Sequence, residues 1–503
     1  MKLFKPKLLL VSPGEINEYI QKETQGISQP RDFVKIVKEY LSLNADKGLI
    51  ITGLRSTGKT SGVLQGIAGS NLKAIYVSPL DRVNKVSDRQ IIRRLEKKNF
   101  DIVVIDEYTW IESKDSSLAN YLVGLLKSGK KVIITGTDSA KIHALKNTEF
   151  IHRTIEINTT YFAYDEYCRI YGLEKNTDSR TSYLKNGGIF ESHASESFGS
   201  MRDYIQNAII DNLASYYPNY DPEVVKVAIY TLFYECIHKT YLKEPNETAP
   251  IYNYESNDLF ETYLNMFGVN TSIKVPASIT NEIASKLQEI GVLVKLNDLR
   301  LPRKSRMYIT NQSISYQMVK VIYNLDELSH SYLGHLYEAS VVCNQYMQRV
   351  FGIINPSYQI SYLEGRKKGQ DYEIDFVLYD KKSAYLFDCK YSSNSDITVS
   401  ETASIAKDIV GELLGERDIC GRFIVYEGKN QVRQINGKTV VFVNDWNFNP
   451  EKFDEIVNKE NKNKNETMLP LANNDEQNSV QAQQKNTNNN VSDNIQNGMQ
   501  GPS

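Results

Sequence analysis

The sequence predicts an α/β protein with a parallel sheet in its N-terminal part, a helical middle region containing a winged-helix module, and a second, mixed α/β domain near the C-terminus. Three observations predict the parallel sheet. Short, continuously apolar runs indicate strands that are covered on both faces. A glycine-rich turn follows the first run, and two acids follow the third. The runs are Leu49–Ile51, Ala74–Val77, Ile102–Ile105 and Val132–Ile134.

Length and composition set the frame for these predictions. The 503 residues leave room for roughly three domains of ~150 residues. A net charge of -2 excludes a general attraction to nucleic acid, so any such surface must be a local patch. The five cysteines include no C-x-x-C pair, which argues against a disulfide framework or a zinc site. Because no apolar stretch approaches the ~18 residues of a membrane span, we expect a cytoplasmic protein with no membrane partner.

Six segments are expected along the chain. They are an N-terminal extension (1–29), a P-loop core (30–160), a helical lid or linker region (161–270), a winged-helix-like module (271–330), a mixed α/β domain (331–448) and a tail (449–503). The tail is rich in Asn, Gln, Lys and Glu and has almost no large apolar side chains. Such a segment cannot bury enough surface to offset its ordering entropy, so we expect it to be disordered.

The most specific motif is a phosphate-binding loop. The run Gly53-Leu54-Arg55-Ser56-Thr57-Gly58-Lys59-Thr60 matches G-x-x-x-x-G-K-[ST]. Its glycines let the backbone wrap a phosphate, and the following helix turns its first amides toward it. Lys59 is expected to reach the β- and γ-phosphates of ATP, and the Thr60 hydroxyl to hold Mg²⁺. The predicted ATP-binding set is Gly53, Ser56, Thr57, Gly58, Lys59, Thr60 and Ser61, together with Thr137 at the end of a later strand.

Two further strands complete the predicted ATP site. The apolar strand after Asp101 ends in Asp106 and Glu107. Asp106 is expected to contact the Mg²⁺ shell, and Glu107 to polarise the attacking water as a general base. The strand Lys131–Thr135 runs into a polar turn, where Thr137 is the first choice, and Thr135 the second, for sensing the γ-phosphate. The alternative to a sensing role is that these residues only form an ordinary capped turn.

The order of these motifs resembles that of AAA+-type ATPases, in particular the prokaryotic AAA ATPases with a C-terminal domain of unknown function. In that family a Gly-Arg pair precedes a segment ending in Phe-x-x-x-Glu; His152-Arg153 and Phe162–Glu166 are similar here. The resemblance implies that Arg153 is a catalytic arginine touching a neighbour's nucleotide, with further copies of the chain as partners. A surface salt bridge of Arg153 is the alternative. His152 replaces the usual Gly, and the usual Pro-Leu-Ser is absent.

A helix followed by a hairpin is predicted in the middle region. Ser278–Ile290 has a helical period, and Gly291 is placed to end the helix. Two apolar runs then flank a basic turn, which is the plan of a winged-helix module; a plain helix packed on a hairpin is the alternative. The basic residues are expected to contact DNA phosphates, unless they only form a solvated turn. They are Arg300, Arg303, Lys304 and Arg306.

Acidic residues in the C-terminal domain form the pattern D-x₁₂-D-x-K. Asp375 and Asp388 lie in apolar, strand-like runs, where an unpaired carboxylate would be costly. This is the pattern of PD-(D/E)XK nucleases, in which acids hold Mg²⁺ and the lysine, here Lys390, positions water or stabilises charge. The same ATPase family has a similar Gly-x-Leu-x-Glu upstream, which implies that Glu338 is the helix acid of this metal set. Asp388 stands where that family has Glu.

Three functions remain open from the sequence. The first is an ATP-hydrolysing motor or switch that acts on DNA through the winged-helix and nuclease-like domains, and the resemblance implies the handling of DNA. The second is a signalling or regulatory switch in which ATP controls binding to a protein partner. The third is an ATP-regulated, Mg²⁺-dependent endonuclease; a nuclease-like scaffold that does not cleave is its alternative.

Overall fold

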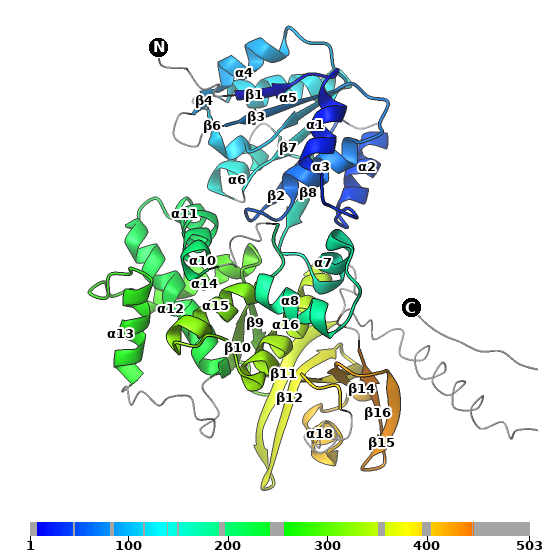
Figure 1. The fold of residues 1–503 in the computed structure, drawn as a ribbon, viewed down its shortest axis with the longest axis vertical. Helices are drawn as coiled ribbons and strands as arrows, with labels where there is room; N and C mark the ends of the chain where they lie inside the picture. The colour runs from blue at the N-terminus through cyan, green and yellow to red at the C-terminus, as the bar shows by residue number, and fades with distance from the viewer. Residues whose placement is uncertain are drawn as a thin grey trace, which may run out of the picture. The chain divides into compact units, whose positions relative to one another are not determined.

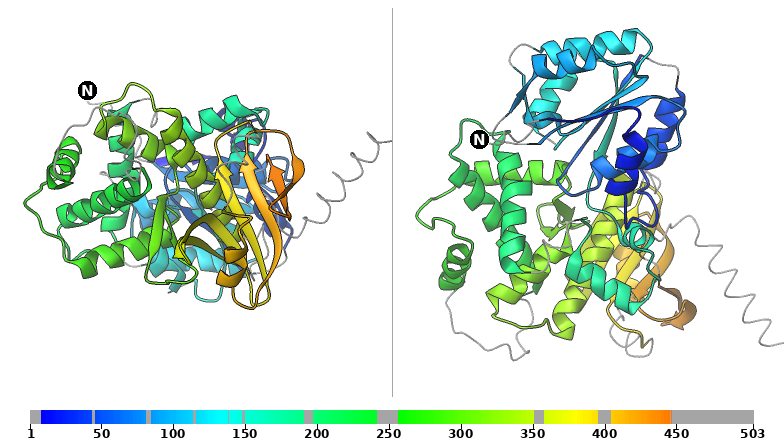
Figure 2. Two further views of the ribbon diagram at one scale, coloured as in Figure 1. Left: turned by 90° about the horizontal axis from the view of Figure 1, so that it is seen from below. Right: turned by 45° about the horizontal axis from the view of Figure 1, so that its top comes forward.

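The structure is a computed structural model that describes residues 8–43, 46–80, 85–113, 116–137, 139–147, 150–190, 197–241, 256–350, 358–394, 404–444 and 446. The predicted tail, 449–503, lies outside these residues. Among the helices of the described ranges, none is both long and apolar enough to cross a membrane. Figure 1 shows the fold, and Figure 2 shows it from two further directions, with the C-terminal strands (yellow to orange) beside the helical region (green).

A six-stranded sheet forms the N-terminal domain (Figure 1). Its order is β1-β3-β5-β7-β2-β8, and all neighbours are parallel except β1 and β3. The strands are β1 (Leu8–Val11), β2 (Gly48–Gly53), β3 (Ala74–Pro79), β5 (Ile102–Ile105), β7 (Lys131–Thr135) and β8 (Thr154–Thr159). The four apolar runs are therefore strands of one largely parallel sheet, which confirms the predicted α/β core. The segment expected to be an extension supplies the edge strand β1.

Helices cover both faces of this sheet. One face packs against α1 (Ile16–Glu23), α2 (Val34–Ser42) and α3 (Lys59–Ile67). The other packs against α4 (Asp88–Leu95), α5 (Ser117–Lys127) and α6 (Ala140–Asn147). Successive strand residues alternate between the two cores, so that Leu49 and Ile51 face α3 while Ile50 faces the opposite layer. This double burial explains why the strands are continuously apolar. A turn η1 (Tyr108–Trp110) and the short pair β4 (Val86–Ser87) and β6 (Ile111–Glu112) complete the domain.

In the described residues of the middle region, the regular structure is helical apart from one hairpin. Its helices are α7 (Tyr164–Tyr171), α8 (Thr177–Asn186), α10 (Phe198–Tyr204), the π-helical turn η2 (Ile205–Ile210), α11 (Asp211–Ala214), α12 (Pro222–Tyr241), α13 (Ser256–Met266), α14 (Ala277–Glu289), α15 (Gln312–Ile322) and α16 (His330–Val350). The hairpin β9 (Leu293–Asn297) and β10 (Ser305–Ile309) is antiparallel and follows α14. A helix and a hairpin thus lie where the sequence places them, and α15 follows at once.

A second six-stranded sheet, of mixed direction, forms the C-terminal domain. Its order is β11-β12-β13-β14-β16-β15, with β13-β14 and β14-β16 parallel and the other pairs antiparallel. The strands are β11 (Gln359–Lys367), β12 (Gln370–Tyr379), β13 (Ser383–Lys390), β14 (Asp418–Tyr426), β15 (Gln431–Ile435) and β16 (Lys438–Val443). The helix α18 (Asp408–Leu413) packs on one face, and α16 contacts β12 and β13. The sheet therefore carries α16 directly against the strands that hold Asp375 and Asp388.

Candidate functional site

The phosphate-binding loop joins β2 to α3 with a strongly curled backbone. Gly53 and Gly58 have φ angles of 141° and 77°, and Ser56 has 62°, all in the region that favours glycine. A Cβ at Gly53 would lie 2.0 Å from the carbonyl oxygen of Thr159, and one at Gly58 would lie 2.4 Å from the ring of Phe190. A side chain at Gly53 would collide with backbone, and one at Gly58 would displace the Phe190 ring, so packing as well as the curl favours glycine at both positions.

Lys59 is buried at the start of α3 and points back into the loop. Its Nζ donates to the carbonyl oxygens of Gly53 at 3.3 Å and Leu54 at 2.6 Å. Burial lowers the pKa of Lys59, while the carboxylates of Glu107 and Asp106 act in the opposite direction. The ammonium group therefore lies within the electrostatic reach of both acids, as the predicted site requires.

Asp106 connects the acid strand to the loop. Its Oδ2 accepts a hydrogen bond from the Thr60 hydroxyl at 2.9 Å and another from Tyr76 at 2.5 Å. Its Oδ1 accepts one from the Thr135 hydroxyl. The side chain is only 3% exposed. Thr60 and Asp106, the two residues predicted to hold Mg²⁺ in the P-loop, are thus in direct contact. Ser61 follows Thr60, half-buried, in the first turn of α3.

Glu107 begins the turn after β5 with a left-handed backbone, at a φ of 48°. Such a backbone is costly for a residue other than glycine and is concentrated at functional sites. Its amide donates to the Thr135 hydroxyl at 3.3 Å. Thr135 thereby contacts both acids, whereas Thr137 lines a different cavity with Trp110 and Lys141. The structure places the second choice for the γ-phosphate sensor, rather than the first, against the acids.

Arg153 lies at the far edge of the sheet from the loop. It precedes β8, whose first residue pairs with Gly48 at the start of β2, and the loop follows the other end of β2. Its guanidinium forms an ion pair with the exposed carboxylate of Asp46. Arg153 therefore does not contact the phosphate loop of its own chain, and the surface salt bridge that was the alternative is present.

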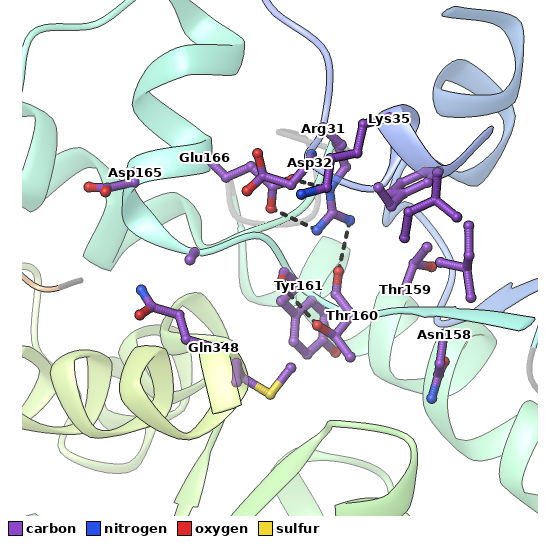
Figure 3. Close-up of a pocket in the computed structure, with 15 residues that line it drawn as sticks. Arg31, Asp32, Lys35, Asn158, Thr159, Thr160, Tyr161, Asp165, Glu166 and Gln348 are labelled. Atoms are coloured by element: carbon purple, nitrogen blue, oxygen red, sulfur yellow. Dashed lines mark hydrogen bonds and ion pairs between the residues drawn. The ribbon is translucent and has the colours of Figure 1, made fainter. Parts of the chain in front are cut away.

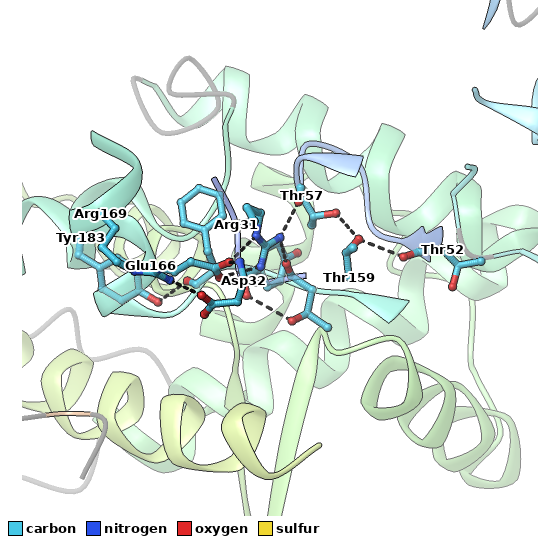
Figure 4. Close-up of polar contacts among 11 residues, drawn as sticks. Arg31, Asp32, Thr52, Thr57, Thr159, Glu166, Arg169 and Tyr183 are labelled. Atoms are coloured by element: carbon cyan, nitrogen blue, oxygen red, sulfur yellow. Dashed lines mark hydrogen bonds and ion pairs between the residues drawn. The ribbon is translucent and has the colours of Figure 1, made fainter. Parts of the chain in front are cut away.

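Arg31 is a buried residue of the site that no sequence motif indicated. It lines a cavity of about 400 Å³ beside the loop, together with the segment Ile157–Tyr161 and, from α16, Met347 and Gln348 (Figure 3). Its guanidinium contacts the loop carbonyl of Thr57 and the carboxylate of Glu166 (Figure 4). The one available signal was Glu166, the acid of the Phe-x-x-x-Glu segment, which needs a cation as its partner where it is buried.

The C-terminal acids converge on the face of the sheet next to α16. The Asp375 carboxylate accepts from the Cys389 amide at 2.6 Å, and Lys390 Nζ lies 3.5 Å from Asp388. Burial, then the charge of Asp375, raises the pKa of Asp388. Burial and Asp375 likewise raise the pKa of Glu338 to about 8. The four residues of the nuclease-like pattern are therefore close enough to influence one another's protonation.

Two expectations about this region differ from the structure: the contact of Arg306 with DNA and the metal set of three acids. The Arg306 guanidinium lies 3.6 Å from Glu338, 2.9 Å from Glu364 and 2.5 Å from Glu373, and over the ring of Tyr362. It is therefore enclosed by carboxylates and is not available for a DNA phosphate. Within the described residues, no three His, Cys, Asp or Glu side chains are arranged to hold a metal ion, so the predicted set of Glu338, Asp375 and Asp388 is not assembled as one.

The other basic residues of the hairpin turn remain at the surface. Arg303 and Lys304 are exposed. Arg300 is exposed as well, although one of its nitrogens donates to the Tyr372 hydroxyl at 2.9 Å. Three of the four predicted DNA-contacting residues are thus placed where a phosphate can reach them.

Comparison with known proteins agrees with this geometry. Residues 45–168 match the family described as AAA domain. No curated protein sequence matches the chain. Two solved structures are similar at low level. The Aeropyrum pernix ORC1 protein in complex with DNA has a TM-score of 0.25 and 10% identity, over 64% of this chain and 99% of that chain. The Drosophila ORC bound to DNA has a TM-score of 0.25 and 12% identity, over 60% of this chain and 91% of that chain.

TM-scores this low do not establish a shared fold. The family match and the geometry of the P-loop do not depend on them. The matched residues contain the phosphate loop, the acid strand and the strand that ends in Thr135. The match to the AAA domain family and the P-loop geometry thus fall in the same part of the chain.

Proposed function

We propose that the chain binds ATP with Mg²⁺ at the P-loop, hydrolyses it, and uses the nucleotide to control its association with DNA. The observation that carries the proposal is the 2.9 Å hydrogen bond between Thr60 and Asp106, with buried Lys59 beside them. Two halves of a motif that are remote in the sequence meet at one edge of the sheet. Their oxygen atoms are the ligands that Mg²⁺ prefers.

The residues of the site divide the work of phosphoryl transfer among them. The loop amides and the Lys59 ammonium would hold the β- and γ-phosphates. Thr60 and Asp106 would hold Mg²⁺, which neutralises charge on the phosphates. Glu107 would accept a proton from the attacking water. Thr135, which is hydrogen-bonded to Asp106 and to the Glu107 amide, would hold the two acids in position beside the terminal phosphate.

The cavity beside Arg31 has the size to take part of the nucleotide. Its volume of about 400 Å³ is within the usual range of ligand pockets. It adjoins the loop through Arg31, which contacts the Thr57 carbonyl. We assign the base and ribose to it, with the phosphates on the loop.

A basic surface on two hairpin turns supports the DNA part of the proposal. The β9–β10 turn presents Arg303 and Lys304. Near the β11–β12 turn, Arg366 of β11 and Lys368 are also exposed, and they form surface ion pairs with Asp371 and Glu412. The hairpins are joined by a bridge between Asp298 and Tyr362. Phosphate contacts of this kind give affinity without reading sequence.

The structure bears differently on the two alternative functions, the endonuclease and the ATP-controlled binding of a protein partner. Endonuclease activity is disfavoured, because Arg306 engages the carboxylates near Glu338, and the scaffold interpretation is favoured. Control of a protein partner by ATP remains the alternative to DNA association.

The test is ATP hydrolysis by the full chain with Mg²⁺, measured without DNA and with linear, single-stranded and branched DNA. We expect turnover in the wild type, stimulation by at least one DNA, and turnover near background in Lys59→Ala with an unchanged circular dichroism spectrum. Equal turnover in Lys59→Ala would show that the site is misassigned. A rate indifferent to every DNA, without salt-dependent DNA binding, would favour the protein-partner switch.

A further inference from the structure

Arg31 and Glu166 form a buried ion pair that touches the phosphate loop. Nη2 and Nε of Arg31 donate to the two carboxylate oxygens of Glu166 at 2.8 and 3.0 Å, and each side chain is 8% exposed. Nη1 donates at 2.5 Å to the carbonyl oxygen of Thr57 and at 2.9 Å to that of Thr160 (Figure 4). One guanidinium therefore ties together the loop, the segment after β8 and the first turn of α7.

The surroundings hold this pair in its charged form. The Arg31 guanidinium lies 5.6 Å from the ring centre of Phe33 and 5.3 Å from that of Phe162. Burial raises the pKa of Glu166, but the charge and hydrogen bonds of Arg31 outweigh burial, and the pKa lies below its ordinary value. The Asp32 amide donates to the same carboxylate at 2.9 Å. The pair is thus charged at neutral pH, and hydrogen bonds to Thr57, Thr160 and the Asp32 amide hold it in place.

A second buried pair continues from α8 to the C-terminal sheet. Arg180 lies 2.7 Å from Glu427, at the end of β14, and the two side chains are 2% and 3% exposed. Helices α7 and α8 are joined between the two pairs, because the hydroxyls of Tyr164 and Ser179 are 2.7 Å apart. Helices α7 and α8 thus connect the P-loop to the C-terminal sheet through two buried Arg–Glu contacts.

Aromatic packing extends the connection to α16, which lies next to the face of the C-terminal sheet that carries Asp375 and Asp388. The ring of Trp446 lies 4.7 Å from that of Tyr164 in α7 and 5.1 Å from that of Tyr337 in α16. Tyr337 is the neighbour of Glu338 in the sequence. Close-packed interiors transmit displacements between elements, and these ring contacts give a movement of α7 a route to α16.

We propose that Arg31 is a positioning residue that transmits occupancy of the P-loop to helices α7 and α8 and, through Arg180 and Glu427, to the C-terminal sheet. The inference rests on the proposed binding of ATP at this loop. Phosphate is held by the loop amides, and the Thr57 carbonyl belongs to the same backbone. A movement of that backbone shifts the Thr57 carbonyl that Arg31 contacts, and the ion pair between Arg31 and Glu166 carries the shift to α7.

The variant that tests the role is Arg31→Lys, which keeps the charge but cannot form the planar two-pronged contact of a guanidinium. Its matched control is Arg169→Lys. Arg169 pairs with Asp32 at 2.6 Å, close to the same site, but at the surface, where the two side chains are 44% and 50% exposed. The control therefore removes an arginine fork next to the proposed route while leaving the bonds of Arg31 to Thr57, Thr160 and Glu166 in place.

The measurement is amide hydrogen exchange of the full chain with and without a Mg²⁺-bound, non-hydrolysable ATP analogue. In the wild type and in Arg169→Lys we expect the analogue to slow exchange in α8 and around Glu427 by about 5- to 150-fold, the usual range of coupling between sites. In Arg31→Lys, compared with the wild type at analogue concentrations that saturate each protein, exchange in α8 no longer responds to the analogue. A purely structural arginine would change exchange equally with and without the analogue.

Each other outcome has a distinct meaning. A normal nucleotide response of α8 in Arg31→Lys would overturn the inference. So would a wild type that binds the analogue without any response in α8, while the proposed ATP site would stand. A wild type that fails to bind the analogue would overturn the proposed function itself. If Arg31→Lys does not fold, Glu166→Gln replaces it, since it keeps the side-chain shape and removes the charge, and the same loss is expected.

Discussion

Thr60 and Asp106 are 46 positions apart in the sequence, yet hydroxyl and carboxylate oxygen are separated by 2.9 Å. The strand β7 lies between β2 and β5, so the two side chains meet across its end. Thr135, the last residue of β7, donates to the other oxygen of Asp106. Strand order therefore decides which side chains meet at the proposed metal and phosphate site, and it makes their roles separable by mutation.

Substitution of the proposed general base should separate binding from hydrolysis. We expect Glu107→Gln to bind ATP with affinity close to that of the wild type and to hydrolyse it about 10²- to 10⁴-fold more slowly, the usual contribution of a positioned base. Equilibrium binding and steady-state turnover measure the two quantities. The exposed Glu112, five residues further along, supplies the control Glu112→Gln, which should turn over normally. Loss of binding in Glu107→Gln would contradict the assignment.

The two candidate sensor residues should behave differently. Thr135→Ala removes hydrogen bonds to Asp106 and to the Glu107 amide, so we expect turnover to fall by about 10²-fold or more, as when a positioned donor is removed from an active site. Thr137→Ala removes neither bond and should retain turnover within about a factor of three, the scale of a change below 1 kcal/mol. Steady-state kinetics at saturating ATP distinguish them. The reverse ranking would restore Thr137 as the sensor.

Charge reversal on the β9–β10 turn should weaken DNA binding in a salt-dependent way. We expect Arg303→Glu with Lys304→Glu to lower affinity and to reduce the slope of log K against log salt by about 0.9 for each DNA phosphate that the turn no longer neutralises. Fluorescence anisotropy over a salt series gives the slope. Lys381→Glu with Lys382→Glu, at the other end of β12, is the matched control. Equal slopes for the two double variants would remove the turn from the DNA surface.

The protonation of Glu338 should make stability depend on pH. Burial and Asp375 raise its pKa to about 8, above that of the unfolded chain, so between about pH 4.5 and 8 the folded state binds more protons. Stability supplied by the protonated form is therefore lost as pH rises, by about 1.4 kcal/mol for each pH unit over which one extra proton is held. Glu338→Gln should flatten this fall in urea unfolding measured from pH 5 to 8. An unchanged slope would show that Glu338 is ionised in the folded protein.

The sequence predicts the parts of the site that depend on local chemistry. Gly53, Gly58 and Lys59 lie within one short motif whose spacing dictates the loop, and the doubly buried strands are evident from continuous apolar runs. The structure places Thr135 rather than Thr137 in contact with the acids, and this contact depends on where β7 ends. The sequence does not fix that point to within two residues.

Long-range pairing is beyond the reach of sequence patterns. Arg31 and Glu166 are 135 positions apart, and only the fold brings them together. Arg306 belongs to the basic turn by sequence, but it is the second residue of β10, so strand geometry rather than turn chemistry directs its side chain. There it meets Glu364 and Glu373 of the neighbouring hairpin, whose docking no local pattern encodes.

The strand β1 has a practical consequence for preparing shortened forms of the protein. It closes one edge of the P-loop sheet by pairing with β3 from Leu8 to Val11. A chain begun at residue 30, the expected domain boundary, would leave the apolar strand β3 with unpaired backbone groups, and such an edge recruits other molecules into aggregates. Truncations meant for crystallisation or kinetics should therefore begin before Leu8.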